Sequence, residues 1–309
     1  MSGTRPKAAV ESPAAWRIFL AFVLALLAAM LFAAIVSPWV QAALAPLQVF
    51  PLHRVFSRLT MLGVIVITIW LLRRFQLFDR ALLGYATPRA QFLRRVAVGL
   101  FTGLALMAVA LWTLFLLDVR VWNARVPTEV AGWLMLITKG LGTGLAVALI
   151  EETFFRGALQ GALQRSGATR WALFAVPALY AAVHFLGRAA TVPYEEVDLR
   201  SGFVALQGFF TAYAQPLAIA DAFLALWCVG LLLALVRRRW GDIAGCIGLH
   251  AGFVAAITVF RKVSSPGVPN YLLVGGFDGL LGLWIALLAA LACGALLLGR
   301  RAPNMVKRR

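Results

Sequence analysis

The sequence predicts an all-α protein, a polytopic bundle of about eight transmembrane helices with both termini in the cytoplasm. Of its 309 residues, 62% are hydrophobic and only 13% are charged, and the mean hydropathy is +0.88. A soluble domain has roughly 45–50% apolar and about 25% charged residues, so this composition excludes a soluble globular protein. The apolar residues also gather into runs near the ~20 residues that a helix needs to cross a bilayer.

Eight apolar runs give the number of helices. The first run follows a short basic segment, but it is too long for the apolar core of a signal peptide, so we expect it to remain as a helix. The long loop after the fifth run is expected to carry a short interfacial helix from about Phe203 to Tyr213. The eight runs span residues 16–38, 55–72, 96–117, 130–155, 171–187, 217–236, 243–260 and 277–299.

The formal net charge of +17, from 29 basic and 12 acidic residues, is interpreted as a signal of topology. With the N-terminus in the cytoplasm, 20 of the 29 Lys and Arg residues fall in cytoplasmic segments. By the positive-inside rule, this distribution favours an even number of spans. We therefore expect the lipid bilayer, and no nucleic acid, to be the partner of the basic residues. The excess of Arg over Lys is typical of a GC-rich bacterial gene, so we expect the protein to lie in the inner membrane of a bacterium.

Ionisable residues inside spans are candidates for function, because each costs about 2.5–3.5 kcal/mol to insert and usually faces the bundle interior. Glu151 and Glu152 directly follow an apolar stretch. On a helix, Glu152 and Arg156 are spaced i, i+4 and can form an ion pair, whereas Glu151 points about 100° away and is left free to accept a proton. An ordinary exposed salt bridge at an interfacial helix end is the structural alternative.

Two of the three histidines, His184 and His250, lie within apolar runs. A single buried histidine is more often structural, but two histidines and a glutamate pair on three helices favour one convergent polar site. We expect this site to open toward the cytoplasm. Structural roles are expected for a solvated loop histidine, a lysine near an interface and three helix-capping aspartates: His53, Lys139, Asp221, Asp242 and Asp278.

Three motifs occur in order on successive hydrophobic segments. They are E-E-x-x-x-R at Glu151, Glu152 and Arg156, an aromatic-x-x-x-His from Tyr180 to His184, and a histidine motif at His250. In this order they resemble the CAAX prenyl protease and bacteriocin-processing (CPBP, or Abi) family, intramembrane endopeptidases that include the Ras-converting CAAX endopeptidase. The resemblance covers about residues 130–260 and implies that Glu151, Glu152, Arg156, His184 and His250 are catalytic.

This resemblance divides the chain into three parts. Residues 1–129 would hold three N-terminal helices, residues 130–260 the catalytic core of four helices, and residues 261–309 the last helix and a basic cytoplasmic tail. The chain departs from the family pattern at two positions. Tyr180 stands where the family usually has Phe, and Val254 stands where it has an Asn thought to help bind the carbonyl oxygen. Thr258, one turn beyond Val254, is a candidate substitute donor.

The predicted function is hydrolysis of a peptide bond in a membrane-associated protein or peptide. In this hypothesis Glu151 and His184 activate a water, Glu152 and Arg156 order the helix, and His250 donates to the oxyanion. Two other classes stay open. A catalytically silent scaffold or bacteriocin immunity factor is favoured by Val254, and a proton-coupled transporter would predict internal repeats or broken helices.

A zinc ion is the alternative to a site without a cofactor. We expect no cofactor, because a glutamate-activated water explains the glutamate pair and the H-E-x-x-H helix of zinc proteases is absent. The three cysteines each lie alone in an apolar run and offer no thiolate site. With a metal present, Glu151, His184 and His250 would form a His₂Glu zinc site with an open position.

Overall fold

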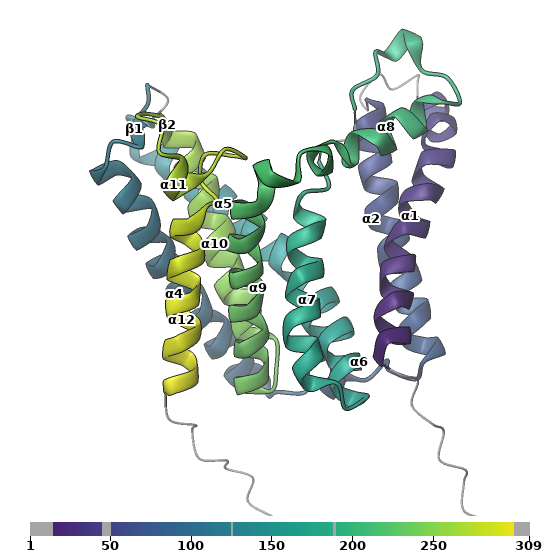
Figure 1. The fold of residues 1–309 in the computed structure, drawn as a ribbon, viewed down its shortest axis with the longest axis horizontal. Helices are drawn as coiled ribbons and strands as arrows, with labels where there is room; N and C mark the ends of the chain where they lie inside the picture. Colours follow the sequence, from purple (N-terminus) through teal and green to yellow (C-terminus); the bar gives the residue numbers. More distant parts are fainter. Residues whose placement is uncertain (1–14, 45–50, 125, 188–189, 300–309) are drawn as a thin grey trace, which may run out of the picture.

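The computed structural model describes residues 15–44, 51–124, 126–187 and 190–299, and these form a helical bundle (Figure 1). Each of the eight apolar runs overlaps one long helix. The eight helices are α1 (Ala15–Leu44), α2 (Leu52–Arg74), α4 (Arg89–Leu116), α5 (Val130–Glu152), α7 (Thr169–His184), α9 (Ala220–Trp240), α10 (Ala244–Val263) and α12 (Leu283–Leu298). The predicted all-α class is confirmed.

Six helices of the described chain are long and apolar enough to cross a membrane. They include α5 together with its continuation to Arg165, and α9 together with the turn that begins at Pro216. The other two long helices, α7 and α12, have 16 residues each. The protein is therefore an integral membrane protein, and the count of eight spans stays a prediction.

The ends of the described chain lie on one side of the bundle. Figure 1 shows that α1 begins and α12 ends at its lower end, as an even number of passes requires. The assignment of that end to the cytoplasm remains a prediction from the basic residues. Many of those residues, among them Arg5, Lys7 and the tail from Arg300, lie outside the described residues.

Short elements connect the long helices. The predicted interfacial helix is present as α8 (Ser201–Phe209), followed by a 3₁₀ turn at Thr211–Ala214. A small antiparallel pair, β1 (Arg120–Trp122) with β2 (Ser264–Pro266), adds strands that the sequence did not predict. The remaining short segments are α3 (Arg80–Leu83), α6 (Gln160–Arg165), α11 (Tyr271–Val274) and 3₁₀ turns at Tyr194–Glu196 and Pro216–Ile219.

Helix α10 packs between α4 and α5, and glycines allow the backbones to approach closely. A Cβ on Gly248 would lie 2.0 Å from the carbonyl oxygen of Val96 in α4, and one on Gly144 of α5 would lie 2.5 Å from that of Ala251. Small residues at such spacings are typical of packed membrane helices. Because Gly248 and Ala251 flank His250, this close packing fixes the position of that histidine.

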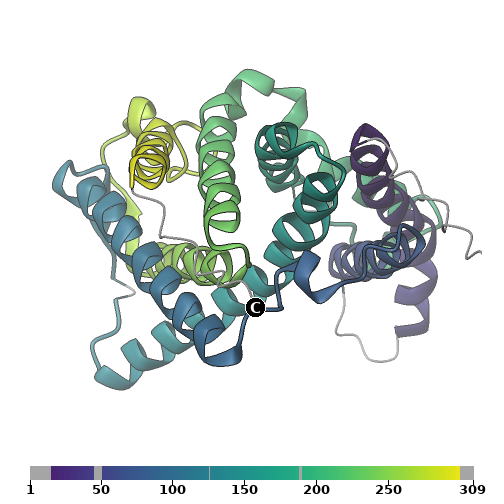
Figure 2. The ribbon, with the colours of Figure 1, turned by 90° about the horizontal axis from the view of Figure 1, so that it is seen from below.

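Helix α9 lies between α7 on one side and α12 on the other, with α1 and α2 at the far end of the elongated bundle (Figure 2). A Cβ on Gly230 of α9 would lie 3.0–3.1 Å from atoms of Pro177 and Tyr180 in α7. The absence of a side chain at Gly230 therefore brings α9 close to α7, the helix that carries the second motif.

The residues predicted to be structural behave mostly as expected. Asp242 caps α10 by accepting from the amide of Ala244 at 3.1 Å, and it also forms an ion pair with Arg95 of α4. Asp278 accepts from two amides ahead of α12, Asp221 lies in the first turn of α9, and Lys139 is exposed on α5. His53 was wrongly placed in a loop: α2 begins at Leu52, so this histidine is half-buried in the first helical turn.

Candidate active site

The carboxylate of Glu151 faces both intramembrane histidines. Its Oε2 atom lies 3.9 Å from Nε2 of His184 and 3.9 Å from Nε2 of His250. These three side chains come from the end of α5, the last residue of α7 and the first half of α10. The structure therefore brings together the three groups that the sequence placed on separate helices.

The second glutamate is fully buried and holds two partners through one oxygen. Oε1 of Glu152 lies 2.8 Å from Nδ1 of His250 and 3.1 Å from a guanidinium nitrogen of Arg156. Neither Glu152 nor Arg156 is exposed at all. The predicted i, i+4 ion pair is present, but Glu152 also binds His250 directly, so it does more than order its own helix.

Arg156 is surrounded by groups that suit a buried cation. It donates to the carbonyl oxygen of Gly230 at 3.1 Å. Its guanidinium also lies 4.4 Å from the centroid of the Tyr180 ring, a cation–π contact. Because a buried arginine needs its charge balanced and its donors bonded, these contacts explain why it is stable beside Glu152.

The hydrogen-bond partners of the two imidazoles decide which ring nitrogens carry protons. Nδ1 of His184 lies 2.7 Å from the carbonyl oxygen of Tyr180, which can only accept, so this nitrogen must donate. Nδ1 of His250 likewise donates to the Glu152 carboxylate. In the neutral form, Nε2 of His184 is thus an acceptor directed at the space beside Glu151. Both rings present Nε2 to the same carboxylate.

A π-helical segment, Thr153–Leu159, begins directly after the glutamate pair. Such segments are rare and often occur at functional sites, and the sequence analysis did not predict this one. A Cβ on Gly157 would lie 2.9 Å from the carbonyl oxygen of Leu83, so helix α3 packs against the segment at this glycine. The widened turn keeps Glu152 and Arg156 on the same side.

Two further polar residues near the site were missed by the sequence analysis. Gln160, one turn beyond Arg156, is fully buried and donates to the carbonyl oxygen of Ala234 in α9 at 3.1 Å. Arg237 of α9 donates to the carbonyl oxygens of Arg156 and Leu82. The available signals were the i, i+4 spacing of Gln160 from Arg156 and the place of Arg237 in the last turn of α9.

Several buried polar atoms of this segment have no hydrogen-bond partner in the described chain. They are Oε2 of Glu151, Oε2 of Glu152, Nε of Arg156 and Oε1 of Gln160. Buried polar atoms in folded proteins are nearly always bonded, to protein or to ordered water. A water or a ligand beside Glu151 would complete the bonding of its Oε2 atom.

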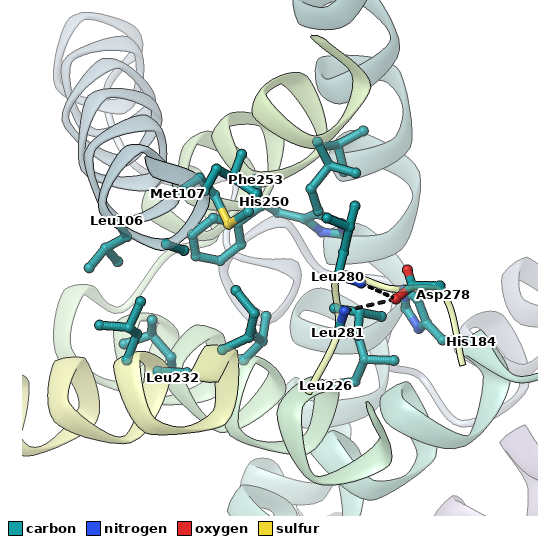
Figure 3. Close-up of a pocket in the computed structure, with 18 of the residues that line it drawn as sticks. Leu106, Met107, His184, Leu226, Leu232, His250, Phe253, Asp278, Leu280 and Leu281 are labelled. Carbon is teal, nitrogen blue, oxygen red and sulfur yellow. Dashed lines mark hydrogen bonds between the residues drawn. The ribbon is translucent and has the colours of Figure 1, made fainter. Parts of the chain in front are cut away.

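A cavity of about 240 Å³ adjoins the histidines (Figure 3). Its lining is mostly apolar side chains from α4, α9, α10 and α12, and Tyr180, His184 and His250 also line it. It extends to Arg261 and Asp278, which belong to the end of the bundle that carries β1 and β2. The prediction of a pocket on the side of the termini is therefore wrong.

The two departures from the motif pattern lie in this cavity. Tyr180 and Val254 both line it, and the Tyr180 hydroxyl has no hydrogen-bond partner among the described residues. Thr258, in contrast, donates its hydroxyl to the carbonyl oxygen of Val254 at 2.7 Å. The predicted substitute donor is thus already engaged with its own helix.

The geometry of the donor atoms allows a test of the zinc alternative. Tetrahedral zinc with bonds of about 2.0–2.1 Å holds its ligand atoms about 3.3–3.4 Å apart. Both separations between Glu151 and the histidines are longer, at 3.9 Å. Within the described ranges, no group of three or more His, Cys, Asp or Glu side chains is arranged to hold a metal ion. The side chains as placed are thus farther apart than a tetrahedral zinc site requires, and a site without a cofactor stays a prediction.

A comparison with protein families matches residues 131–256 to the family described as "Type II CAAX prenyl endopeptidase Rce1-like". Residues 131–256 belong to the CAAX protease family. The match contains all five predicted catalytic residues and supports a peptide hydrolase that acts in the membrane. No curated protein and no solved structure matches the chain.

Proposed function

We propose that this protein is an endopeptidase of the inner membrane of a bacterium, which cleaves a peptide bond of a membrane-associated protein or peptide. The observation that carries the proposal is the equal 3.9 Å separation of Glu151 Oε2 from the two histidine Nε2 atoms. A water in this space can donate one hydrogen to Glu151 and the other to Nε2 of His184. The substrate would occupy the adjoining apolar cavity.

The reaction begins when Glu151 takes a proton from the water, whose oxygen then bonds to the carbonyl carbon of the substrate. The proton passes to the leaving amine nitrogen as the C–N bond breaks, so that water is divided between the two products. Glu151 is half-buried, with its side chain 30% exposed, and its Oε2 is buried and unpartnered. A carboxylate in such surroundings can bind one water as a general base while most other solvent is excluded.

His250 is suited to stabilise the oxyanion. With Nδ1 donating to the Glu152 carboxylate, a proton on Nε2 makes His250 a cation whose second N–H points to the reacting centre. The cluster would then contain Glu151 and Glu152 as anions and Arg156 and His250 as cations. A net charge of zero keeps such a buried cluster tolerable in a region of low dielectric.

The Tyr180 hydroxyl is a second oxyanion donor in this proposal. It lines the cavity together with His250, and Val254 on the same surface provides no donor. The chain would thus use a hydroxyl on α7 in place of the amide that the family pattern has on α10. Removal of one oxyanion donor typically lowers the rate by about 10² to 10³.

A substrate-trapping comparison tests the proposal. Full-length Glu151→Gln protein is used in membranes to capture peptides, and purified wild-type protein is then assayed on those peptides by mass spectrometry. Wild type should cleave them and Glu151→Gln should not, while Glu195→Gln, an exposed glutamate of the long loop, serves as the matched control. Equal cleavage by wild type and Glu151→Gln, or capture without any cleavage by wild type, would favour the scaffold function.

A further inference from the structure

The end of the cavity that lies eleven positions beyond His250 along α10 is charged. Arg261, on the last turns of α10, and Asp278, in the segment before α12, both line it and form an ion pair at 2.5 Å. The Arg261 side chain is 54% exposed, whereas that of Asp278 is 16% exposed. Figure 3 shows Asp278 beside the cavity with two backbone amides bonded to one of its oxygens. The carboxylate is therefore fixed, and the guanidinium is the more accessible partner.

A second guanidinium adjoins this ion pair. Arg120 of β1 is only 8% exposed and donates to the hydroxyl and carbonyl oxygens of Ser264. Burial lowers the pKa of Arg120, the positive charge of Arg261 lowers it further, and the Asp278 carboxylate opposes both effects. Asp278 is paired with Arg261 and also interacts electrostatically with Arg120, so the cluster of these three side chains has a net charge of +1.

We propose that Arg261, supported by Arg120, binds a carboxylate of the peptide substrate at this end of the cavity. Guanidinium groups bind carboxylates through paired N–H donors, and a second carboxylate would balance the charge of the cluster. This inference rests on the proposed function only in naming the bound molecule as the substrate. The carboxylate comes either from the C-terminus of the peptide or from an Asp or Glu side chain.

The length of α10 between the two ends of the cavity limits where that carboxylate lies. His250 and Arg261 are separated by 11 positions, or about 16 Å along a helix at ~1.5 Å per residue. An extended peptide covers about 3.3 Å per residue. The carboxylate that Arg261 binds therefore lies within about five residues of the scissile bond. The apolar lining between the two ends requires that the intervening side chains be apolar.

A binding experiment tests this site separately from catalysis. The probes are three N-dansylated Leu/Ala hexapeptides: one with a free C-terminus, one amidated, and one amidated with Glu as its last residue. Binding is followed by fluorescence on full-length Glu151→Gln protein in detergent, so that the probe is not consumed. We expect Arg261→Gln to weaken binding of the free-acid or the Glu-containing peptide by about 10- to 100-fold, and to leave the plain amide unchanged.

Two further variants sharpen this test. Lys262→Gln removes the same charge from the neighbouring, exposed residue and should leave all three affinities unchanged. Asp278→Asn keeps an amide-accepting oxygen but removes the competing carboxylate, so it should strengthen binding of the carboxylate probes several-fold. If only the free-acid peptide loses affinity in Arg261→Gln, the ligand is a terminal carboxylate. If only the Glu-containing peptide loses affinity, the ligand is a side-chain carboxylate. Equal affinities for the three probes, or equal losses in Arg261→Gln and Lys262→Gln, would overturn the site.

The same peptides on wild-type protein separate the two proposals. Cleavage is measured by mass spectrometry for the free-acid, amidated and Glu-containing probes. Cleavage at equal rates would reject the carboxylate site and retain the protease. Binding that depends on Arg261 without cleavage of any probe would retain the carboxylate site and count against the protease. Because this assay uses wild-type protein, it also tests the carboxylate site if Glu151→Gln folds poorly.

Discussion

Nδ1 of His250 lies 2.8 Å from the same Glu152 oxygen that holds Arg156 at 3.1 Å. One carboxylate oxygen therefore connects the π-helical segment after α5 with α10, in a place where none of the three side chains is more than 4% exposed. The hydrogen bond between Glu152 and Nδ1 of His250 orients the imidazole so that its Nε2 atom faces Glu151. The same contact therefore bonds a buried carboxylate and fixes the ring orientation in the proposed active site.

Removal of Arg156 should be costly because it leaves the buried Glu152 carboxylate without its cation. We expect Arg156→Met to destabilise the protein by about 3–5 kcal/mol, as measured by unfolding in detergent. Arg165→Met, at the exposed end of α6, is the matched control and should change stability by less than about 1 kcal/mol. The double variant Glu152→Gln with Arg156→Met should recover part of the loss, since no isolated charge then remains. A similar loss of stability in Arg156→Met and Arg165→Met would contradict this interpretation.

The second prediction concerns Tyr180 of α7, whose hydroxyl is proposed to replace the Asn that the family pattern has at position 254 of α10. Tyr180→Phe should lower the rate of peptide cleavage by about 10² to 10³ if the hydroxyl stabilises the oxyanion. Because that hydroxyl has no partner in the described chain, its removal should change the unfolding temperature little.

Restoring an amide at the other position provides the control for Tyr180. The double variant Tyr180→Phe with Val254→Asn should recover much of the lost rate, since an Asn at position 254 would line the same cavity. Val254→Asn alone should not reduce the rate. Full activity in Tyr180→Phe would remove the tyrosine from the mechanism.

The sequence predicted the membrane bundle and the positions of its long helices because hydrophobic runs depend on local composition. It also placed Glu151, Glu152, His184 and His250 in one site, because isolated ionisable groups in apolar helices are expensive unless they meet. The Glu152–Arg156 pair was predictable from helical spacing alone.

Other features depend on contacts between distant segments and could not be predicted in this way. The π-helical turn at Thr153–Leu159 is formed where α3 packs on Gly157, and no local pattern identifies that neighbour. The cavity extends to Arg261 and Asp278, which pair between α10 and the segment before α12, and no local pattern predicts that contact. The role of Gln160 depends on its hydrogen bond to the Ala234 carbonyl oxygen of α9, a contact that the sequence does not reveal.

A third prediction concerns metal dependence. Because the Glu151–histidine separations of 3.9 Å are longer than tetrahedral zinc requires, we expect purified protein to contain less than one equivalent of zinc by elemental analysis. Cleavage should be unchanged after treatment with 1,10-phenanthroline or EDTA. An activity that is lost on chelation and restored by added zinc would instead support a His₂Glu site of Glu151, His184 and His250.

The glycines of α10 provide the last prediction, with a control inside the same bundle. A Cβ on Gly248 would lie 2.0 Å from the Val96 carbonyl oxygen, whereas one on Gly142 of α5 would meet nothing within 4 Å. Gly248→Ala should therefore destabilise the protein by about 1–3 kcal/mol, as overpacked sites do. Gly142→Ala should be neutral or stabilise it by up to about 1 kcal/mol.

Cleavage rates distinguish a positional effect on the site from a general loss of stability. Gly248 lies two residues before His250, so a displacement of α10 from α4 also moves the imidazole away from Glu151. Gly248→Ala should then lower cleavage even at temperatures where the protein is fully folded, and Gly142→Ala should not. Normal cleavage by folded Gly248→Ala protein would show that the packing of α10 on α4 does not set the position of His250.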